Sequence, residues 1–429
     1  MFIRLFIRLF IRLFIRLFIV CSVALLSGCA TTSPDSASVL NVSDAANDTS
    51  VNAGEGTAVA LRDLGARMRS GETPQNPLFL SQEDRRLAFA HTEKFMPARV
   101  VKAAGNPYPL TPAPMDFSTL VYEVDGESFS VADFLAMPSA IGYMVVKDDQ
   151  VLLEHYADGH NTDSIWVSFS VTKSVTSMLI GAAIQDGYIQ SVQDTVDMYL
   201  PRLRGTPYGA VTIEDVLHMA SGIAWNEDYE DPESDVAIAG AYNGVQLTDY
   251  FGQLPRNHAA GEVFNYNTGE ANLAGEILRA AIGNNAATFL SHQIWQPFGM
   301  GNDATWLIDM PGGGEAGGCC ISATLGDYAR LGLFAMHDGV LPNGERVLPE
   351  GWMATSITPF KGREDYGYMW WLSGDGSYRA GGIFAQMIFV DPVNNVVISA
   401  HGNSSTAVNS PYHKHLGAVT NAIRQQITQ

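Results

Sequence analysis

The sequence predicts an α+β fold, with one antiparallel β-sheet built from both ends of the chain and flanked by helices. An all-helical lobe is expected to be inserted between the two parts of the sheet. Three observations lead to this prediction: strand patterns early in the chain, a mostly helical middle from about 188 to 335, and further strand patterns near the end. The chain has 429 residues, which is long enough to bury such a core.

Apolar runs and turn residues define the individual elements. Residues 141–146 and 151–156 are apolar on either side of the polar segment 147–150, which predicts a β-hairpin. Apolar residues at helical spacing predict a helix from Ser170 to about Gln185. Three short strands are then expected at 367–372, 386–390 and 396–400, with a turn at 391–395 and a closing helix at 413–427.

The N-terminal residues are expected to be a targeting signal rather than part of the fold. Phe-Ile-Arg-Leu repeats four times from Phe2 to Leu17, and a short apolar stretch then leads to Leu26-Ser27-Gly28-Cys29. A basic segment, an apolar segment and small residues before a cut site are typical of a secretory signal. The cysteine after Leu-Ser-Gly resembles a bacterial lipobox. We therefore expect residues 1–28 to be removed and Cys29 to carry a lipid.

This lipid would hold the protein in the bacterial cell envelope, on the periplasmic side and at the outer membrane. A transmembrane helix is not expected, because the charge-free stretch at 17–28 is shorter than the roughly 20 residues that a span needs. Residues 29–75 are expected to form a flexible tether, since 30–60 are rich in Ser, Thr, Asp, Asn, Ala and Gly. The folded domain is expected over 76–429.

Charge and cysteine content exclude several classes of function. The chain has 25 basic and 45 acidic side chains, a net charge of −20, which argues against binding to nucleic acid. Membrane contact is expected through the lipid alone, and the oligomeric state is left open. Cys319 and Cys320 are expected to stay unpaired as small buried residues, because neighbouring cysteines rarely pair. No metal site and no cofactor are expected, since the histidines show no His-Glu-x-x-His pattern.

Ser170 and Lys173 form the most informative pair in the sequence. A serine hydroxyl is a weak nucleophile that needs a nearby base. Three residues along a helix bring two side chains onto one face, so Lys173 can reach the Ser170 hydroxyl. The chain has six lysines, and only Lys173 follows a serine at this spacing.

Two further segments carry candidate chemistry. Tyr266 precedes a predicted helix, and a tyrosine near a lysine can have a lowered pKa, so that its phenolate would deprotonate Ser170. Gly381-Gly382-Ile383 lies at a predicted strand, where glycines let a substrate approach the backbone. A backbone N–H there, together with the N–H of Ser170, would stabilise an oxyanion.

Together these segments resemble the serine hydrolases related to class C β-lactamases and D-alanyl-D-alanine peptidases. The resemblance spans about 117–429 and rests on six segments in order: 141–156, 168–174, 217–222, 264–275, 317–332 and 366–371. It implies an antiparallel sheet of five or more strands beside an all-helical lobe, with the site in the cleft between them. It also implies that Ser170 is the acylated nucleophile, Lys173 its activating partner and Tyr266 the proton-transfer residue.

The departures from that family pattern are informative. Thr268 stands where the Tyr-x-Asn motif has asparagine, and Arg379-Ala380-Gly381-Gly382 lacks the lysine or histidine of the third motif. These absences lower the expectation of penicillin or D-Ala-D-Ala hydrolysis. Arg379 remains a candidate to supply the missing charge.

Gly382-Ile383 followed by Gln386 is closer to the branch of 6-aminohexanoate-oligomer hydrolases and carboxylesterases. That branch implies that Ile383 gives the second oxyanion N–H, or Gly382 if the register is one residue shorter. Tyr229 matches a loop tyrosine that closes over the amide in that branch. Tyr229, Gly382 and Thr268 are therefore the expected substrate-binding residues.

We therefore expect an exported, lipid-anchored serine hydrolase that cleaves small esters or linear amides through an acyl-enzyme on Ser170. The expected partner is a small ester, amide or peptide substrate. Two alternatives remain. One is D-Ala-D-Ala peptidase or β-lactamase activity, and the other is a catalytically silent module of the same fold that binds cell-wall peptide. An α/β-hydrolase is disfavoured because the chain has no Gly-x-Ser-x-Gly elbow.

Overall fold

A computed structural model of the chain describes residues 44–240 and 242–428. The predicted signal peptide and the predicted lipidation site, Cys29, lie outside the described residues. Residues 57–429 form one compact unit, which carries both sheets and the site.

The first described helix corrects the predicted tether. Helix α2 covers Asp44–Ser70, within the stretch 29–75 that was expected to be flexible. Leu64 and Met68 are buried in a cluster with Leu80 and Phe89. Because residues four apart lie on one face of a helix, these two side chains give α2 an apolar face that packs onto the domain. The segment 57–75 is therefore part of the fold.

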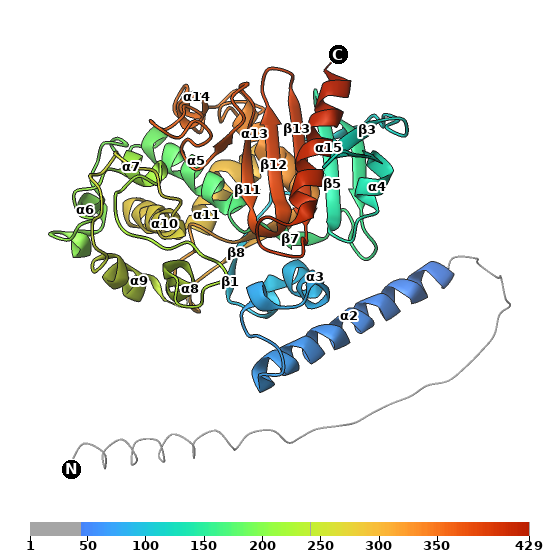
Figure 1. Cartoon of the computed structure of the whole chain (residues 1–429), viewed down its shortest axis with the longest axis horizontal. Coiled ribbons are helices and arrows are strands. Elements are labelled where there is room, and N and C mark those ends of the chain that lie inside the picture. The colour runs from blue at the N-terminus through green and yellow to red at the C-terminus, as the bar shows by residue number, and fades with distance from the viewer. Residues whose placement is uncertain (1–43, 241, 429) are drawn as a thin grey trace, which may run out of the picture. The chain divides into compact units, whose positions relative to one another are not determined.

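The main sheet has seven strands, drawn from both ends of the chain as predicted. Its order is β10-β11-β12-β13-β5-β6-β2, and every pair is antiparallel except β2 with β6. Figure 1 shows β11, β12, β13 and β5 side by side, with α15 beside them. The strands are β2 (Thr111–Pro112), β5 (Ala140–Lys147), β6 (Gln150–Tyr156), β10 (Trp371–Leu372), β11 (Tyr378–Gly382), β12 (Gln386–Asp391) and β13 (Val396–Gly402). The predicted hairpin and late strands are confirmed, although β10 is shorter than expected.

Both faces of this sheet are buried, which explains why β5 is an almost unbroken apolar run. Along β5, Tyr143 and Val145 join one core cluster, while Met144 and Val146 join another. This alternation follows from the period of two in a strand. The first face packs against α15 (Pro411–Ile427), and the second packs against α5 (Val171–Gln185) and α13 (Leu325–Met336).

A second sheet was not predicted. Its order is β1-β8-β9-β7, formed by β1 (Ala98–Val101), β8 (Ala304–Leu307), β9 (Ile321–Thr324) and β7 (Ile165–Val167). Each strand has three or four residues. Strands this short show too little alternation to be recognised, and their partners lie far away in sequence. This sheet positions the nucleophile, because β7 leads directly into α5.

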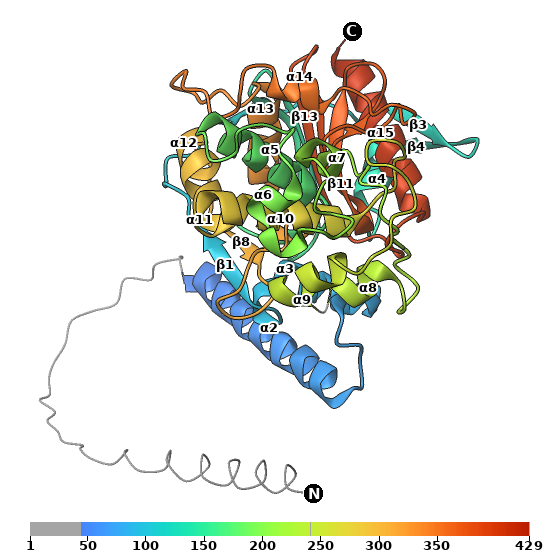
Figure 2. The same ribbon diagram turned by 90° about the vertical axis from the view of Figure 1, so that its left-hand side faces the viewer.

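The helical lobe occupies the middle of the chain, as expected. Figure 2 shows two of its helices, α6 and α10, next to α5 near the centre of the view. Its helices are α6 (Val196–Tyr199), α7 (Ile213–Leu217), α8 (Asp235–Ala239), α9 (Gly244–Phe251), α10 (Thr268–Ile282), α11 (Ala286–Leu290) and α12 (Gln296–Phe298). The remaining elements are α3 (Gln82–Ala90), β3 (Val121–Val124), β4 (Glu127–Ser130), α4 (Val131–Leu135) and α14 (Trp352–Ser356).

The prediction that the neighbouring cysteines are small buried residues agrees with the structure for Cys320, which is buried. Cys319 packs against the same apolar cluster, and the sulfur atoms of the two residues are in contact. That Cys319 and Cys320 stay unpaired remains a prediction.

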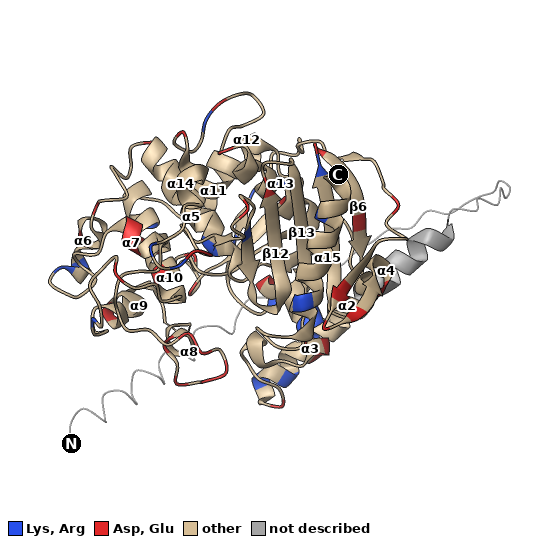
Figure 3. Cartoon of the chain, turned by 45° about the horizontal axis from the view of Figure 1, so that its top comes forward, with Lys and Arg blue, Asp and Glu red and all other residues tan. Residues whose placement is uncertain are grey.

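Charged side chains are spread thinly over the fold. Figure 3 shows Lys and Arg as short, separate segments along the described part of the ribbon. None of the described helices combines the length and the apolar character that crossing a membrane requires. The described residues also hold no group of three His, Cys, Asp or Glu side chains arranged to bind a metal ion.

Candidate active site

The chain turns sharply between β7 and α5, and Ser170 follows the turn. Phe169 has a φ of 45°, the left-handed region that residues other than glycine seldom adopt. Its ring packs 5.0 Å from that of Phe89 and 5.4 Å from that of Phe384, which holds this conformation in place. Ser170 is then the residue at the N-terminus of α5, with its side chain free of any capping bond.

Lys173 lies one turn further along α5 and contacts Ser170, as its spacing predicted. Its Nζ is 2.8 Å from the Ser170 Oγ and 3.0 Å from the carbonyl oxygen of Gly318. Lys173 is 1% exposed. Burial disfavours the ammonium and lowers the pKa of Lys173 to about 8, although the negative charge of Glu227 works in the opposite direction. A large fraction of Lys173 is therefore neutral near pH 8.

Tyr266 completes the group, but in a different protonation state from the one predicted. Its ring centroid lies 5.3 Å from the Lys173 Nζ, and it stacks on Trp371 at 5.6 Å. Burial, reinforced by the charge of Glu227, raises the pKa of Tyr266, while the interaction with Ser170 lowers it by less. Both effects favour the phenol over the predicted phenolate. As a phenol, Tyr266 can give a proton.

The loop at Gly317-Gly318 ties α5 to α10 around this group. The Gly317 carbonyl accepts from the Thr176 hydroxyl at 2.7 Å, and the Gly318 N–H donates to Asn272 at 2.9 Å. A Cβ on Gly317 would overlap the carbonyl oxygen of Ala271, so only glycine allows α10 to approach this closely. The Gly318 carbonyl is thereby fixed where it can accept from Lys173.

The backbone of the third motif lies beside Ser170. Ile383 lines the same pocket as Ser170, and a Cβ on Gly382 would overlap the carbonyl oxygen of Ser168. Among the described residues, the N–H groups of Ser170 and Ile383 take no part in turn, loop or cap hydrogen bonds. Ile383 is therefore the favoured second oxyanion donor, and Gly382 stays the alternative.

Glu227 is the residue that sequence reasoning missed. Its carboxylate accepts from the hydroxyl of Tyr229 at 2.6 Å, from the N–H of Thr268 at 2.9 Å, and from the hydroxyl of Thr268. Tyr229 and Thr268 both line the pocket that contains Ser170, where they were expected. The only signal for Glu227 was an acidic residue two positions before Tyr229, which is indistinguishable from an ordinary solvated loop residue.

Arg379 does not supply the missing cation. It sits on β11 on the side opposite Tyr378 and Ala380, with its guanidinium 5.6 Å from the Trp371 ring. It is not among the residues that line the pocket. The third-motif position therefore brings no positive charge to Ser170.

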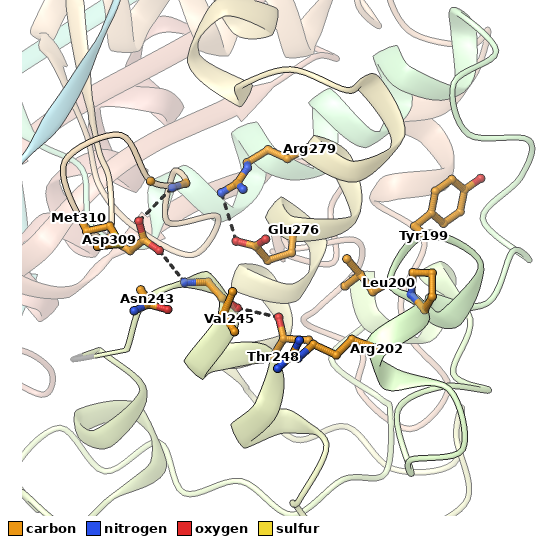
Figure 4. A pocket seen from close by; sticks show the side chains of 14 residues that line it. Tyr199, Leu200, Arg202, Asn243, Val245, Thr248, Glu276, Arg279, Asp309 and Met310 are labelled. Carbon is orange, nitrogen blue, oxygen red and sulfur yellow. Dashed lines mark hydrogen bonds and ion pairs between the residues drawn. The ribbon is translucent and has the colours of Figure 1, made fainter. Parts of the chain in front are cut away.

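The pocket around Ser170 has a volume of about 510 Å³. Much of its wall is apolar, and part of that wall comes from residues 75–79, where the expected tether meets the expected domain. A second cavity of about 340 Å³ shares Gly244, Glu276, Asp309 and Gly314 with it. Figure 4 shows Glu276 paired with Arg279 and Asp309 bonded to backbone N–H groups in that second cavity. The site thus extends beyond the immediate surroundings of Ser170.

Behind the site, Glu270 is a buried carboxyl group on the first turn of α10. It accepts from the Ser221 hydroxyl and from the Asn267 amide at 3.2 Å, and it is 1% exposed. Burial raises the pKa of Glu270 to about 8 from an ordinary value of 4.5. Between these two pH values the folded state keeps a proton that the unfolded state releases. The free energy of unfolding should therefore fall as the pH rises.

Glu270→Gln is expected to abolish the part of the pH-dependent fall in unfolding free energy that comes from Glu270. Wild type should lose up to about 5 kcal/mol of unfolding free energy through this group between pH 4.5 and 8, and the variant should not, because glutamine does not ionise. Urea unfolding at pH 5, 6.5 and 8 measures both slopes, with the exposed Glu350→Gln as the control. Identical slopes in wild type and Glu270→Gln would contradict the assignment.

Comparison with known proteins identifies the family. Residues 131–421 match the family model named Beta-lactamase. The chain belongs to the beta-lactamase family. This is a family of serine hydrolases of the β-lactamase and transpeptidase type.

Individual relatives agree with this placement. The chain is 28% identical over 341 residues to the 6-aminohexanoate-dimer hydrolase of Paenarthrobacter ureafaciens, covering 73% of this chain and 84% of that protein. A solved structure from Bacillus anthracis, assigned as a 6-aminohexanoate-dimer hydrolase, has a TM-score of 0.71 and 21% identity, covering 80% of this chain and 94% of that one. A family VIII carboxylesterase has a TM-score of 0.52 and 15% identity, covering 66% and 93%. The predicted β-lactamase-like α+β fold is confirmed.

Proposed function

We propose that the protein is a serine hydrolase that cleaves small esters or linear amides through an acyl-enzyme on Ser170. The observation that carries this proposal is the contact of Lys173 with Ser170 at the edge of a largely apolar pocket that has no third-motif cation. The match to a 6-aminohexanoate-dimer hydrolase supports a linear amide as one class of substrate.

The geometry supports a specific order of proton transfers. Neutral Lys173 accepts the Ser170 proton as the Ser170 Oγ attacks the substrate carbonyl carbon. The N–H groups of Ser170 and Ile383 stabilise the resulting oxyanion. Neutral Tyr266 gives its proton to the leaving amine or alcohol as the carbon–heteroatom bond breaks. Water then hydrolyses the acyl-enzyme by the reverse set of transfers and restores Ser170.

A substrate panel tests the proposal. It consists of p-nitrophenyl butyrate, a linear dimer of an ω-amino acid, nitrocefin and a peptide ending in D-Ala-D-Ala. Turnover of the ester and the linear dimer is expected to exceed turnover of nitrocefin and of the peptide. Fast nitrocefin turnover would instead favour β-lactamase activity. No turnover of any member, with peptide binding that survives Ser170→Ala, would indicate a silent binding module.

We also propose that Cys29 is lipidated and that the lipid holds the enzyme at the periplasmic face of the outer membrane. The support is the sequence pattern before Cys29. Metabolic labelling with a fatty acid and membrane fractionation test this proposal. Cys29→Ala is expected to lose the label, and the control Cys21→Ala is expected to keep it. Retained labelling in Cys29→Ala would contradict it.

A further inference from the structure

The Glu227 carboxylate is bonded to the wall of the pocket without lining it. It accepts hydrogen bonds from the indole N–H of Trp225, from the Tyr229 hydroxyl, and from both the N–H and the hydroxyl of Thr268. Trp225, Tyr229 and Thr268 all line the pocket that contains Ser170. One carboxylate is therefore hydrogen-bonded to three pocket-lining residues.

These bonds fix the hydrogen-bonding character of the wall. The hydroxyls of Tyr229 and Thr268 each have a single proton, and both protons point to Glu227. What remains for a substrate is the lone pairs of the two oxygens. This part of the wall can accept hydrogen bonds from N–H or O–H groups but cannot donate to a carboxylate.

The charged residues of the site also disfavour a bound carboxylate. Lys173 is the one basic residue among the described residues that line this pocket. Asp309 lines it as well, and so do Glu276 and Glu315, which are paired with Arg279 and Arg99. The charge of Glu227 acts on Lys173, Tyr266 and Tyr229, so its field extends to the reacting groups. Like charges repel, and the repulsion is stronger in a partly buried site than in bulk water.

We propose that Glu227 sets the charge selectivity of the site by rejecting substrates that carry a carboxylate near the scissile bond. Neutral substrates, and those that present N–H groups, are favoured instead. The inference rests on the proposed function and narrows its substrate class. Glu227 would act through Tyr229, Thr268 and its own field rather than by touching the reacting atoms, which makes it a specificity-determining residue.

The test compares two esters that differ in one charge: 4-nitrophenyl butyrate and 3-carboxy-4-nitrophenyl butyrate. The readout is the ratio of kcat/KM for the neutral ester to that for the anionic ester. Wild type should prefer the neutral ester at least about tenfold, and Glu227→Gln should lower that ratio at least about fivefold. A purely structural role would lower both rates together and leave the ratio unchanged. Glu227→Asp should keep the preference, because it keeps the charge.

Glu230→Gln is the matched control, since Glu230 lies on the same loop but is exposed. Its ratio should equal that of wild type. An unchanged ratio in a folded, active Glu227→Gln would overturn the inference while leaving the proposed function intact. If wild type turns over neither ester, the proposed function fails, and this inference fails with it.

A measurement on wild type alone keeps the inference testable if Glu227→Gln does not fold. Boronic acids add to a serine hydroxyl, so phenylboronic acid and 3-carboxyphenylboronic acid report binding of a neutral and an anionic group. The neutral compound should bind at least about tenfold more tightly. Equal binding, or tighter binding of the anionic compound, would overturn the inference.

Discussion

Ser170→Ala should lower kcat/KM for p-nitrophenyl butyrate by at least about 10⁴-fold. The Ser170 Oγ lies in the pocket, 2.8 Å from the Lys173 Nζ that takes its proton as it attacks the carbonyl carbon. Alanine leaves the pocket and the oxyanion N–H groups in place but removes the group that becomes acylated. Initial rates at matched protein concentration measure the loss.

Ser177→Ala is a matched control on the same helix. The Ser177 hydroxyl is buried and has no hydrogen-bond partner among the described residues, so its removal should leave both activity and stability close to those of wild type. Thermal unfolding of both variants shows whether each is folded. A folded Ser170→Ala that retains more than about a tenth of wild-type activity would show that another residue carries the reaction.

Lys173→Ala should lower kcat/KM by at least about 10³-fold, because it removes the base that takes the Ser170 proton. In wild type, kcat/KM should rise as the pH increases through about 8, the pKa of Lys173. The direction follows from the role: only the neutral amine can accept a proton, and the amine is neutral above its pKa. Lys173→Arg should not restore activity, since a guanidinium stays charged.

A pH profile of kcat/KM from pH 6 to 10 tests this role. Lys414→Ala is the control, because Lys414 is an exposed lysine that pairs with Asp125 on the surface. The Lys414→Ala variant should keep the wild-type kcat/KM and its rise near pH 8. A flat profile in wild type, or the same rise in the residual activity of Lys173→Ala, would show that Lys173 is not the titrating base.

The sequence allowed the main sheet and the core of the site to be predicted, for clear physical reasons. The hairpin at 141–156 and the strands β12 and β13 have long apolar runs bounded by turn residues. The contact between Ser170 and Lys173 depends only on helical pitch, which is the same in every α-helix. Local patterns of this kind can be read without knowing the rest of the fold.

The features that were missed depend on segments far apart in the sequence. The strands β8 and β9 pair with β1 and β7, and neither strand has a distinctive pattern of its own. The protonation of Tyr266 depends on burial and on Glu227, which lies on another loop. The hydrogen bonds that place Glu227 beside Thr268 span 41 residues. Such effects follow from the assembled structure rather than from any local pattern.

Covalent labelling of Ser170 tests the central claim most directly. The purified protein is treated with a fluorophosphonate, and its mass is measured intact and after digestion. We expect one adduct per chain, located on the peptide that contains Ser170, absent from Ser170→Ala and retained in Ser177→Ala. Folded wild-type protein that takes no label, or a label that persists in Ser170→Ala, would contradict the assignment of Ser170 as the nucleophile.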